Sequence, residues 1–561
     1  MIDPRLFQRK QLLFDASVQE TGGRFAEAAA TYQELIELSE PDARLLHLRA
    51  VACRKAGQVA DAKQAISAAI SLAGGTPVLV AEQAEQEAAD GNLKAALKYL
   101  GRAIKDPSAS VEIRVRQAEL LLQSGDPMRA AHNARHAIAD NAGSTAQLVL
   151  ARACRSFGDW AGMLEATRQV LEVDPDHGYA TGLAAEALIN LGKAEDAADL
   201  MRDADETALA LYADALKRCS DPALAATVYA EVLQRSPDDM EVRFNQATAL
   251  LASGDLKRGF EAYDCRFDRH TATLNNPGLP RWDGGPLKDR HLLIRTEQGL
   301  GEEILHLRPL AMIANEAASI TLEITDRLVP LVRRAHPDIT IVPRTNPPHA
   351  ATTAQHLDLF CPAGDLLRYR PEIPATATTW LAAEQAATDD LSSRCHRTKA
   401  APVVGLCWST ERTPAATSKS IPTTLLRPLL RLTGINFVSL QFGQAGLAEA
   451  RALTQSTGIP LYQDDSIDAL KDLDRAAAQI AAMDLIISIS TTTAHLAGAL
   501  GKPVWVLLNT QPLWHWFSER DRSPWYAGAR LYRQRDSGDW RLPVMQARRD
   551  LEVWRNLRLS R

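Results

Sequence analysis

The chain has 561 residues, too many for one hydrophobic core, so several domains are expected. Its net charge of −6 argues against a nucleic-acid-binding protein, which would usually be basic. Seven cysteines without a C-x-x-C pair, and no long apolar stretch, argue against a disulfide framework, a zinc site, a secretory signal and a transmembrane segment. We therefore expect a cytoplasmic protein.

A glycine recurs about every 34 residues in the Ala-rich first half of the chain. The steps are 34, 34, 34, 33 and 34 residues, which is the period of the tetratricopeptide repeat. The recurring residues are Gly23, Gly57, Gly91, Gly125, Gly158 and Gly192. The period predicts an α-solenoid of helix pairs over residues 1–268, in which each pair buries its apolar face against the next. Such an array favours a groove for a protein partner, with a spacer or dimerisation arm as the alternative.

One repeat in this array is shorter than the others. Ser220 takes the place of the next glycine, only 28 residues after Gly192, and the step to Gly254 is again 34 residues. The six missing residues predict either a bend in the solenoid near residues 192–220 or a trimmed loop without a bend.

After a Pro/Gly-rich linker at 269–290, the pattern changes to strands that alternate with helices. This alternation predicts a parallel sheet in a first lobe, 291–390, and it restarts in a second lobe, 400–538, which precedes a C-terminal helix at 539–561. The expected strands are 291–296, 320–324, 339–342, 403–408, 437–440, 485–488 and 503–507. Two Rossmann-like lobes predict a ligand-binding cleft, because open α/β sheets bind ligands at the carboxyl ends of their strands.

The first polar motif lies between a strand and a helix expected over 299–314. It reads Glu297-Gln298-Gly299-Leu300-Gly301-Glu302. Its backbone amides and the helix N-terminus suit an anion or a closely approaching substrate. The alternative is a tight turn in which Glu302 favours the helix dipole.

The second motif, residues 408–422, follows a strand directly. It is rich in hydroxyl groups and carries Arg412 and Lys419, so it suits a phosphate; a solvated surface loop is the alternative.

A strand, four hydroxyl residues and a helix make up the third motif, residues 488–503. Ser490 to Thr493 would converge on an anion at the positive end of that helix, with His495 in its first turn. Here the alternative is a helix N-cap with a packed histidine.

Together these motifs resemble the bacterial tetratricopeptide-repeat glycosyltransferases, which are related to the heptosyltransferases and more distantly to protein O-GlcNAc transferase. The matching stretches, over about residues 290–540, are EQGLGE, the CWS…SKSIP loop, FVSLQFG, AHLAGALGKPVWVLL and SPWY with LYRQ. The resemblance implies a GT-B fold, with the nucleotide-sugar donor in the second lobe, the acceptor nearer the first, and the last helix crossing back to the first lobe. The chain departs from its relatives at Glu302 and Ser490, where many carry Asp, and at Lys419, where Arg is common.

The residues and the resemblance together predict a metal-independent, inverting glycosyltransferase without a cofactor. Its donor would be a sugar linked to CMP, UDP, ADP or GDP. Glu302 would be the general base, with Glu297 as runner-up, and Lys419 would stabilise the leaving phosphate. The predicted donor-binding residues are Ser409, Lys419, Gln441, Ser490, Thr491, Thr492, Thr493 and His495, and the acceptor-side residues are Gln298, Gly299 and Gly301. Asp472 and Asp474 could hold a metal, but their place before an amphipathic helix favours a helix N-cap.

The expected acceptor is a Ser or Thr hydroxyl of a protein held by the repeats, and the resemblance makes flagellin the leading candidate. Two alternatives stay open. The first is a sugar transferase that acts on lipopolysaccharide or another envelope glycan. The second is a repeat scaffold with an inactive transferase lobe.

Overall fold

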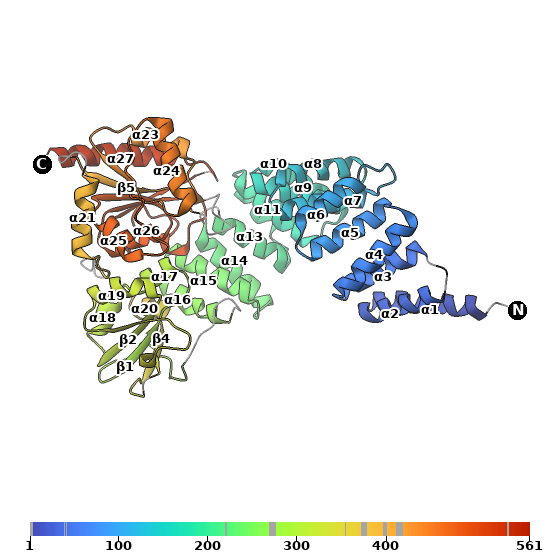
Figure 1. The fold of residues 1–561 in the computed structure, drawn as a ribbon, viewed down its shortest axis with the longest axis horizontal. Helices are drawn as coiled ribbons and strands as arrows, with labels where there is room; N and C mark the ends of the chain where they lie inside the picture. The colour runs from blue at the N-terminus through green and yellow to red at the C-terminus, as the bar shows by residue number, and fades with distance from the viewer. Residues whose placement is uncertain are drawn as a thin grey trace. The chain divides into compact units, whose positions relative to one another are not determined.

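The computed structural model divides into two compact units, Met1–Leu211 and Tyr212–Arg561. It describes residues 4–38, 40, 42–218, 221–268, 277–353, 355–371, 379–396, 401–410, 419–535 and 538–560. The predicted fold class is confirmed, because an α-solenoid precedes two parallel-sheet, Rossmann-like lobes as in a GT-B fold (Figure 1). The boundary between the units lies inside the region predicted as solenoid, so the last solenoid helices belong to the second unit.

Eight helix pairs form the solenoid among the residues that the structure describes. In the first unit, each helix from α1 to α12 packs against the next one along the chain. Small residues such as Ala28, Ala50 and Ala84 are fully buried and let the helices approach closely. The helices are α1 Pro4–Thr21, α2 Phe25–Glu37, α3 Ala43–Lys55, α4 Val59–Ala73, α5 Pro77–Ala89, α6 Leu93–Ala103, α7 Val111–Gln123, α8 Pro127–Ala139, α9 Gly143–Phe157, α10 Trp160–Val173, α11 Gly178–Asn190, α12 Ala194–Leu200, α13 Glu206–Arg218, α14 Pro222–Arg235, α15 Met240–Ser253 and α16 Leu256–Ala262.

The recurring glycines end the first helix of each pair. All six have φ between 71° and 81°, a left-handed conformation that L side chains rarely adopt. The residue after the glycine then donates its N–H to the carbonyl five residues earlier, as Gln58 does to Cys53 at 2.8 Å. This hydrogen bond is the one that closes a Schellman turn. The 34-residue period therefore reflects one helix-ending turn per repeat.

The shortening of one repeat falls on its second helix. Helix α12 has 7 residues, whereas α10 in the preceding repeat has 14. Ser220, where the sequence places the next turn, lies outside the described residues. The missing residues therefore come from a helix, and the boundary between the two units follows in the next one.

The first lobe contains a four-stranded parallel sheet in the order β3-β2-β1-β4. Its strands are β1 His291–Arg295, β2 Ser319–Ile324, β3 Thr340–Pro343 and β4 Leu359–Pro362. Strand β4, which the sequence did not predict, pairs with β1, and Phe360 in it donates its N–H to the carbonyl of Pro280 at 2.9 Å. The single helix expected over 299–314 was wrong, because it is two helices, α17 Leu300–His306 and α18 Leu310–Ala314. Pro309, which has no N–H, separates them.

The second lobe contains a five-stranded parallel sheet in the order β6-β5-β7-β8-β9. Its strands are β5 Val403–Cys407, β6 Asn436–Ser439, β7 Leu485–Ile489, β8 Val504–Leu508 and β9 Ala529–Arg533. The other elements of the two lobes are η1 Tyr263–Phe267, η2 Asp326–Leu328, α19 Val329–Ala335, η3 Ala350–Thr352, α20 Ala363–Tyr369, α21 Gln385–Cys395, α23 Thr423–Leu430, α24 Gly443–Thr457, α25 Leu473–Ala481, α26 Thr492–Ala499, η4 Trp514–Trp516 and α27 Arg541–Leu559. Four of the five strands coincide with predicted ones, and β9 does not.

The C-terminal helix α27 stays with the second lobe. It packs against α23, β8 and β9, and its Arg548 donates to the carbonyl of Pro428 at 3.1 Å. Arg555 donates to the carbonyl of Thr433 at 2.8 Å. The expectation that this helix crosses back to the first lobe was therefore wrong, because it packs against strands β8 and β9 of the second lobe.

One apolar core joins the end of the solenoid to both lobes. It includes Leu251 from α15, Leu292 from β1 and Ile486 from β7, all fully buried. The shared core explains why helices of the solenoid fall within the second unit. Among the described residues, no helix combines the length and apolar character needed to span a bilayer.

Candidate functional site

Two cavities lie in the second unit, where strands of the parallel sheets end. The larger cavity, of about 680 Å³, is lined by residues that follow β1, β8 and β9, namely Thr296, Asn509 and Gln534. The smaller cavity, of about 350 Å³, is lined by Leu440 after β6 and Ser490 after β7. Both volumes are in the range of small-molecule sites, and the carboxyl ends of parallel strands are where open α/β sheets bind ligands.

Most of the residues predicted from the sequence line the smaller cavity. These are Gly299, Gly301, Glu302, Lys419, Gln441, Ser490, Thr491, Thr492, Thr493 and His495. Glu297 and Gln298 line the larger cavity instead, and Ser409 lines neither. The structure thus brings three separate sequence motifs together around one space. Arg412, from the second motif, lies outside the described residues.

The N-terminus of α26 faces the smaller cavity. Thr491 is its N-cap residue, and the first intrahelical bond runs from Ala494 N to Thr491 O at 3.0 Å. The N–H groups of Thr492 and Thr493 precede this bond and so have no acceptor within the helix. The Ser490 hydroxyl is engaged, since it accepts a hydrogen bond from Trp516 Nε1 at 2.8 Å. Free amides at the positive end of a helix suit an anionic ligand.

Lys419 adds a positive charge to the same cavity. Its side chain is partly buried and forms no ion pair or hydrogen bond with any residue that the structure describes. A partly buried ammonium group without a carboxylate partner favours an external anion, because burial weakens its hydration. Lys419 and the start of α26 therefore both bring positive charge to the smaller cavity, whose lining also includes Glu302 and Asp464.

His495 is buried beside these groups and is uncharged. Burial, together with the nearby His306, lowers its pKa to about 3. Its Nδ1 lies 2.6 Å from the Tyr526 hydroxyl. A Cβ on Gly301 would lie 2.8 Å from His495 Cδ2, so glycine is needed for α17 to approach α26. His495 can therefore contact a ligand as a neutral imidazole, while Gly301 has a packing role between the two lobes.

Glu302 lines both cavities. It lies in the first turn of α17, is partly exposed, and makes no hydrogen bond or ion pair within the described part of the chain. Leu513 also lines both cavities. The Glu302 carboxylate is therefore free to act on a group in either space, at the place where the two spaces meet.

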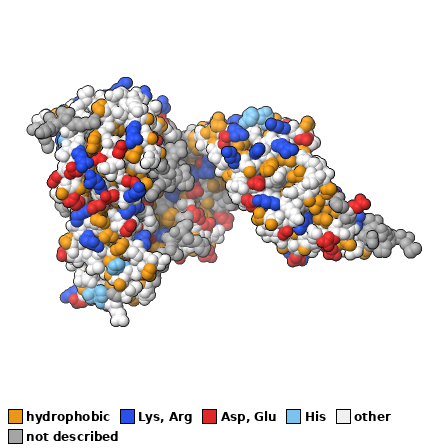
Figure 2. All heavy atoms as spheres, viewed as in Figure 1, with side chains coloured by type: hydrophobic (Ala, Val, Ile, Leu, Met, Phe, Trp, Pro, Cys, Tyr) orange, Lys and Arg blue, Asp and Glu red, His pale blue; other side chains and the backbone are white. Residues whose placement is uncertain are grey.

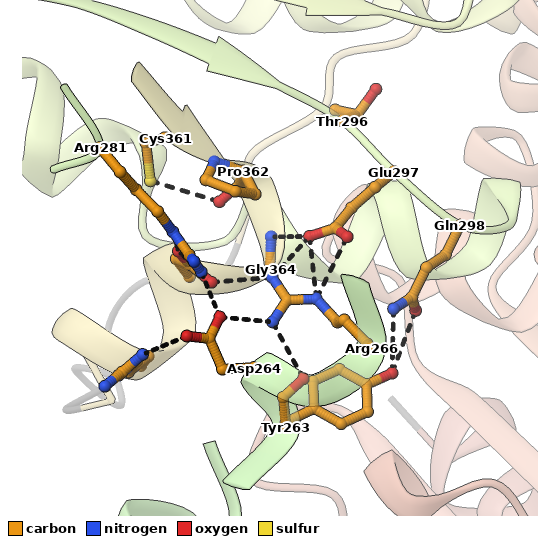
Figure 3. A network of polar contacts seen from close by, with 12 residues as sticks. Tyr263, Asp264, Arg266, Arg281, Thr296, Glu297, Gln298, Cys361, Pro362 and Gly364 are labelled. Carbon is orange, nitrogen blue, oxygen red and sulfur yellow. Dashed lines mark hydrogen bonds and ion pairs between the residues drawn. The ribbon is translucent and has the colours of Figure 1, made fainter. Parts of the chain in front are cut away.

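Glu297, by contrast, is held in an ion pair (Figure 3). Arg266 Nη2 lies 2.8 Å from Glu297 Oε1, and the Gly364 N–H donates to the same oxygen at 3.1 Å. Next to it, Gln298 has a φ of 67° and donates from Nε2 to the Tyr263 hydroxyl at 3.0 Å. These contacts give Glu297 and Gln298 a structural role in the loop that leads to Glu302.

Ser409 and Gln441 support the loop after β5. The Ser409 hydroxyl donates to Glu449 Oε2 at 2.8 Å, and Gln441 Oε1 accepts the Trp408 N–H at 2.8 Å. Gln441 thus borders the smaller cavity with its carboxamide already bonded to the protein. These hydrogen bonds hold Trp408 and Ser409, which directly follow β5, in place.

Several other residues line the smaller cavity and were not predicted from the sequence. Gln479 lies on α25 among apolar residues, is 5% exposed and makes no hydrogen bond with a described residue. A glutamine on the apolar face of an amphipathic helix was the signal that could have identified it.

The N-cap interpretation of Asp472 is confirmed, since its carboxylate accepts the Arg475 N–H at 2.9 Å, and Asp474 pairs with Arg334.

Comparisons with known proteins identify the first part of the chain. Residues 16–77, 115–162 and 211–264 match the family described as tetratricopeptide repeat. Over these segments the chain is similar to tetratricopeptide repeats. It is 29% identical to Protein FlbA of Caulobacter vibrioides over 425 residues, which cover 70% of each protein.

Two solved structures resemble parts of the chain. One is a tetratricopeptide repeat protein from Parabacteroides merdae, with 13% identity over 43% of this chain and 98% of that one, at a TM-score of 0.34. The other is a glycosyl transferase family 9 protein from Veillonella parvula, with 12% identity over 49% of this chain and 99% of that one, at a TM-score of 0.36.

The last helices of the solenoid contribute to the larger cavity. The third matched segment, 211–264, covers helices that belong to the second unit. From these helices, Lys217 and Phe244 line the larger cavity beside residues of both lobes. The cavity thus has a wall made by the repeats and a wall that includes Glu302.

Proposed function

We propose that the protein is a metal-independent, inverting glycosyltransferase that transfers a sugar from a nucleotide-sugar donor to a Ser or Thr hydroxyl of a protein. The observation that carries this proposal is the position of Glu302 between the two cavities. A transferase must bring two substrates to one reacting centre, and a carboxylate that borders both spaces can serve as the base at that centre.

The donor binds in the smaller cavity in this proposal. Its diphosphate, or the single phosphate of a CMP-linked sugar, lies against Lys419 and the N–H groups of Thr492 and Thr493. As the glycosidic bond to phosphate breaks, negative charge develops on the leaving oxygen, and these preorganised groups stabilise it. Apolar residues of the same cavity, such as Ile467 and Leu473, suit the nucleobase or the sugar ring.

The acceptor enters the larger cavity. Its hydroxyl oxygen attacks the anomeric carbon on the side opposite the leaving phosphate, Glu302 takes the hydroxyl proton, and the bond to the phosphate oxygen breaks. The configuration at the anomeric carbon is therefore inverted. The repeats support a protein acceptor, and the resemblance of the sequence motifs to the repeat-containing transferases makes flagellin the first protein to test.

Replacing Lys419 by alanine should weaken nucleotide binding about 10–100-fold, because a charge-assisted hydrogen bond contributes about 1.5–3 kcal/mol. Calorimetry with CMP, UDP, ADP and GDP measures the effect and identifies the nucleotide. Lys471→Ala is the matched control, since Lys471 is exposed in the same lobe and does not line the cavity. Equal affinities for Lys419→Ala and the unchanged protein would contradict the donor site. If none of the four nucleotides binds, the inactive-scaffold alternative is favoured.

Deleting residues 1–205 should separate acceptor docking from chemistry. The remaining chain starts at α13 and keeps the whole second unit. We expect nucleotide affinity and transfer to a short peptide to be retained, and the KM for a folded protein acceptor such as flagellin to rise at least about 10-fold as docking contacts are lost. Retained transfer to a lipopolysaccharide fragment, with none to peptides, would support the envelope-glycan alternative instead.

A further inference from the structure

We propose that the larger cavity recognises its acceptor as an extended polypeptide that carries an acidic side chain beside the acceptor hydroxyl. In this proposal Gln534 pairs with the peptide main chain and Arg533 pairs with the acidic side chain. The inference rests on the proposed function, and it names the chemical class and the recognition groups of the acceptor.

Gln534 is a buried side chain whose hydrogen-bonding groups are unused. It is 6% exposed, lines the larger cavity, and neither Oε1 nor Nε2 has a hydrogen-bond partner among the described residues. Its own N–H is bonded to the carbonyl of Leu508 at 2.9 Å, so the backbone there is fixed as an extension of β9. A buried polar group without a partner costs about 1–3 kcal/mol, and a ligand that supplies both partners removes that cost.

The groups of Gln534 match the main chain of an extended peptide. A carboxamide offers one acceptor oxygen beside an NH₂ donor. In an extended chain, the N–H and C=O of one residue point to the same side, as in a hydrogen-bonded pair of antiparallel strands. Gln534 can therefore bind both groups of one acceptor residue without regard to its side chain.

Arg533 supplies a positive charge that the described residues do not neutralise. Its guanidinium donates to the carbonyls of Trp516 at 2.7 Å and Arg520 at 3.0 Å, and it forms no ion pair with a described carboxylate. Burial lowers the pKa of Arg533 to about 10, so the group stays protonated at neutral pH.

Other arginines that line the larger cavity have a carboxylate partner among the described residues, in contrast to Arg533. Arg266 pairs with Glu297 at 2.8 Å, Arg295 pairs with Glu323 at 3.0 Å, and Arg344 reaches Glu303, which does not line the cavity, at 3.3 Å. Since a partly buried guanidinium favours a carboxylate partner, the ligand is expected to bring one. An uncharged glycan offers hydroxyl groups but no such partner.

Binding of short peptides to the full chain tests this inference. Fluorescein-labelled Ala-Ala-X-Ser-Ala-Ala and Ala-Ala-Ser-X-Ala-Ala peptides, with X as Asp, Asn or Lys, are titrated with the protein and followed by anisotropy. We expect the Asp peptide of one series to bind at least 10-fold more tightly than its Asn form, and the Lys form to bind most weakly.

Two variants assign the parts of the ligand to the two residues. Arg533→Gln should abolish the preference for Asp over Asn. Gln534→Leu should weaken the Asp and Asn peptides by the same factor, at least 5-fold, and leave the preference in place. Arg520→Gln is the matched control, because Arg520 is the neighbouring arginine and does not line the cavity; it should change neither value.

Nucleotide binding by the same variants shows that they are folded and separates the two proposals. If Arg533→Gln keeps the preference for Asp, or if the wild-type protein binds all the peptides equally while it binds a nucleotide, the inference is overturned. If the peptide preferences follow the expected pattern but no nucleotide binds, the acceptor site stands and the transferase function fails.

Discussion

Glu302→Gln should lower kcat about 10²–10⁴-fold, which is the usual contribution of general-base catalysis. The substitution keeps the size of the side chain and removes only its ability to take a proton. Because Glu302 makes no hydrogen bond or ion pair with a described residue, little stability should be lost beyond its interaction with the α17 dipole. Nucleotide release is measured with the sugar donor of the nucleotide that binds most tightly in calorimetry.

A second variant at this position sharpens the test. Glu302→Asp keeps a carboxylate but shortens the side chain by one methylene. This variant should therefore retain more activity than Glu302→Gln. Nucleotide affinity should be the same for both variants, because the carboxylate acts on the acceptor. Equal turnover by Glu302→Gln and the unchanged enzyme would reject Glu302 as the base, and Glu297 could not replace it while bound to Arg266.

Arg266→Leu should destabilise the second unit by about 3–5 kcal/mol, the cost of removing one partner from a buried ion pair. Arg266 is 4% exposed and pairs with Glu297 (Figure 3). Its Nη2 also lies 2.7 Å from Asp365 Oδ1. Arg281 also pairs with Asp365, so that charge would keep one partner, whereas Glu297 would lose its only guanidinium among the described residues.

Urea unfolding followed by tryptophan fluorescence measures this loss. Nine of the ten tryptophans belong to the second unit, with Trp160 as the exception, so the signal reports mainly on that unit. Arg258→Leu is the control, since Arg258 lies in α16, directly before η1, but is 67% exposed in its pair with Asp255. Exposed pairs contribute about 0–1 kcal/mol. Similar losses for the two variants would show that the buried network does not stabilise the unit.

The chain has similar numbers of basic and acidic residues, 63 and 69, and both kinds are found on its surface (Figure 2). Figure 2 shows basic and acidic side chains interspersed over the visible face. Lys419 and Arg533, which form no ion pair with a described carboxylate, line the two cavities. The net charge of −6 therefore describes the surface and gives no information about the site.

Local patterns were sufficient to predict much of the fold. The repeated glycines marked each helix-ending turn, and continuous apolar runs marked seven of the strands. Strand β4, Leu359–Pro362, was missed although it has the same length as β3, which was predicted. Strand β9 was missed because its sequence, ARLYR, carries an arginine at its second and last positions and so lacks an apolar run. Both strands lie at an edge of their sheet.

The smaller cavity could be predicted because its residues follow predicted strands directly. The larger cavity could not, since its groups come from separate parts of the chain. Arg266 and Glu297 are 31 residues apart, on either side of the predicted linker, and no local pattern relates them. Gln534 follows the unpredicted β9, and its unpaired carboxamide is visible only when its surroundings are known.

The attachment of Arg266 to the Glu297 loop has a consequence for chimeric proteins. Arg266 lies in η1, directly after the last solenoid helix. Its partner Glu297 lies five residues before Glu302, in the turn that leads into α17. A graft that exchanges the whole array between related proteins would replace one half of this pair. Successful recombination, in the laboratory or in evolution, should therefore join the parental sequences before α13, so that the exchanged helices leave the second unit intact.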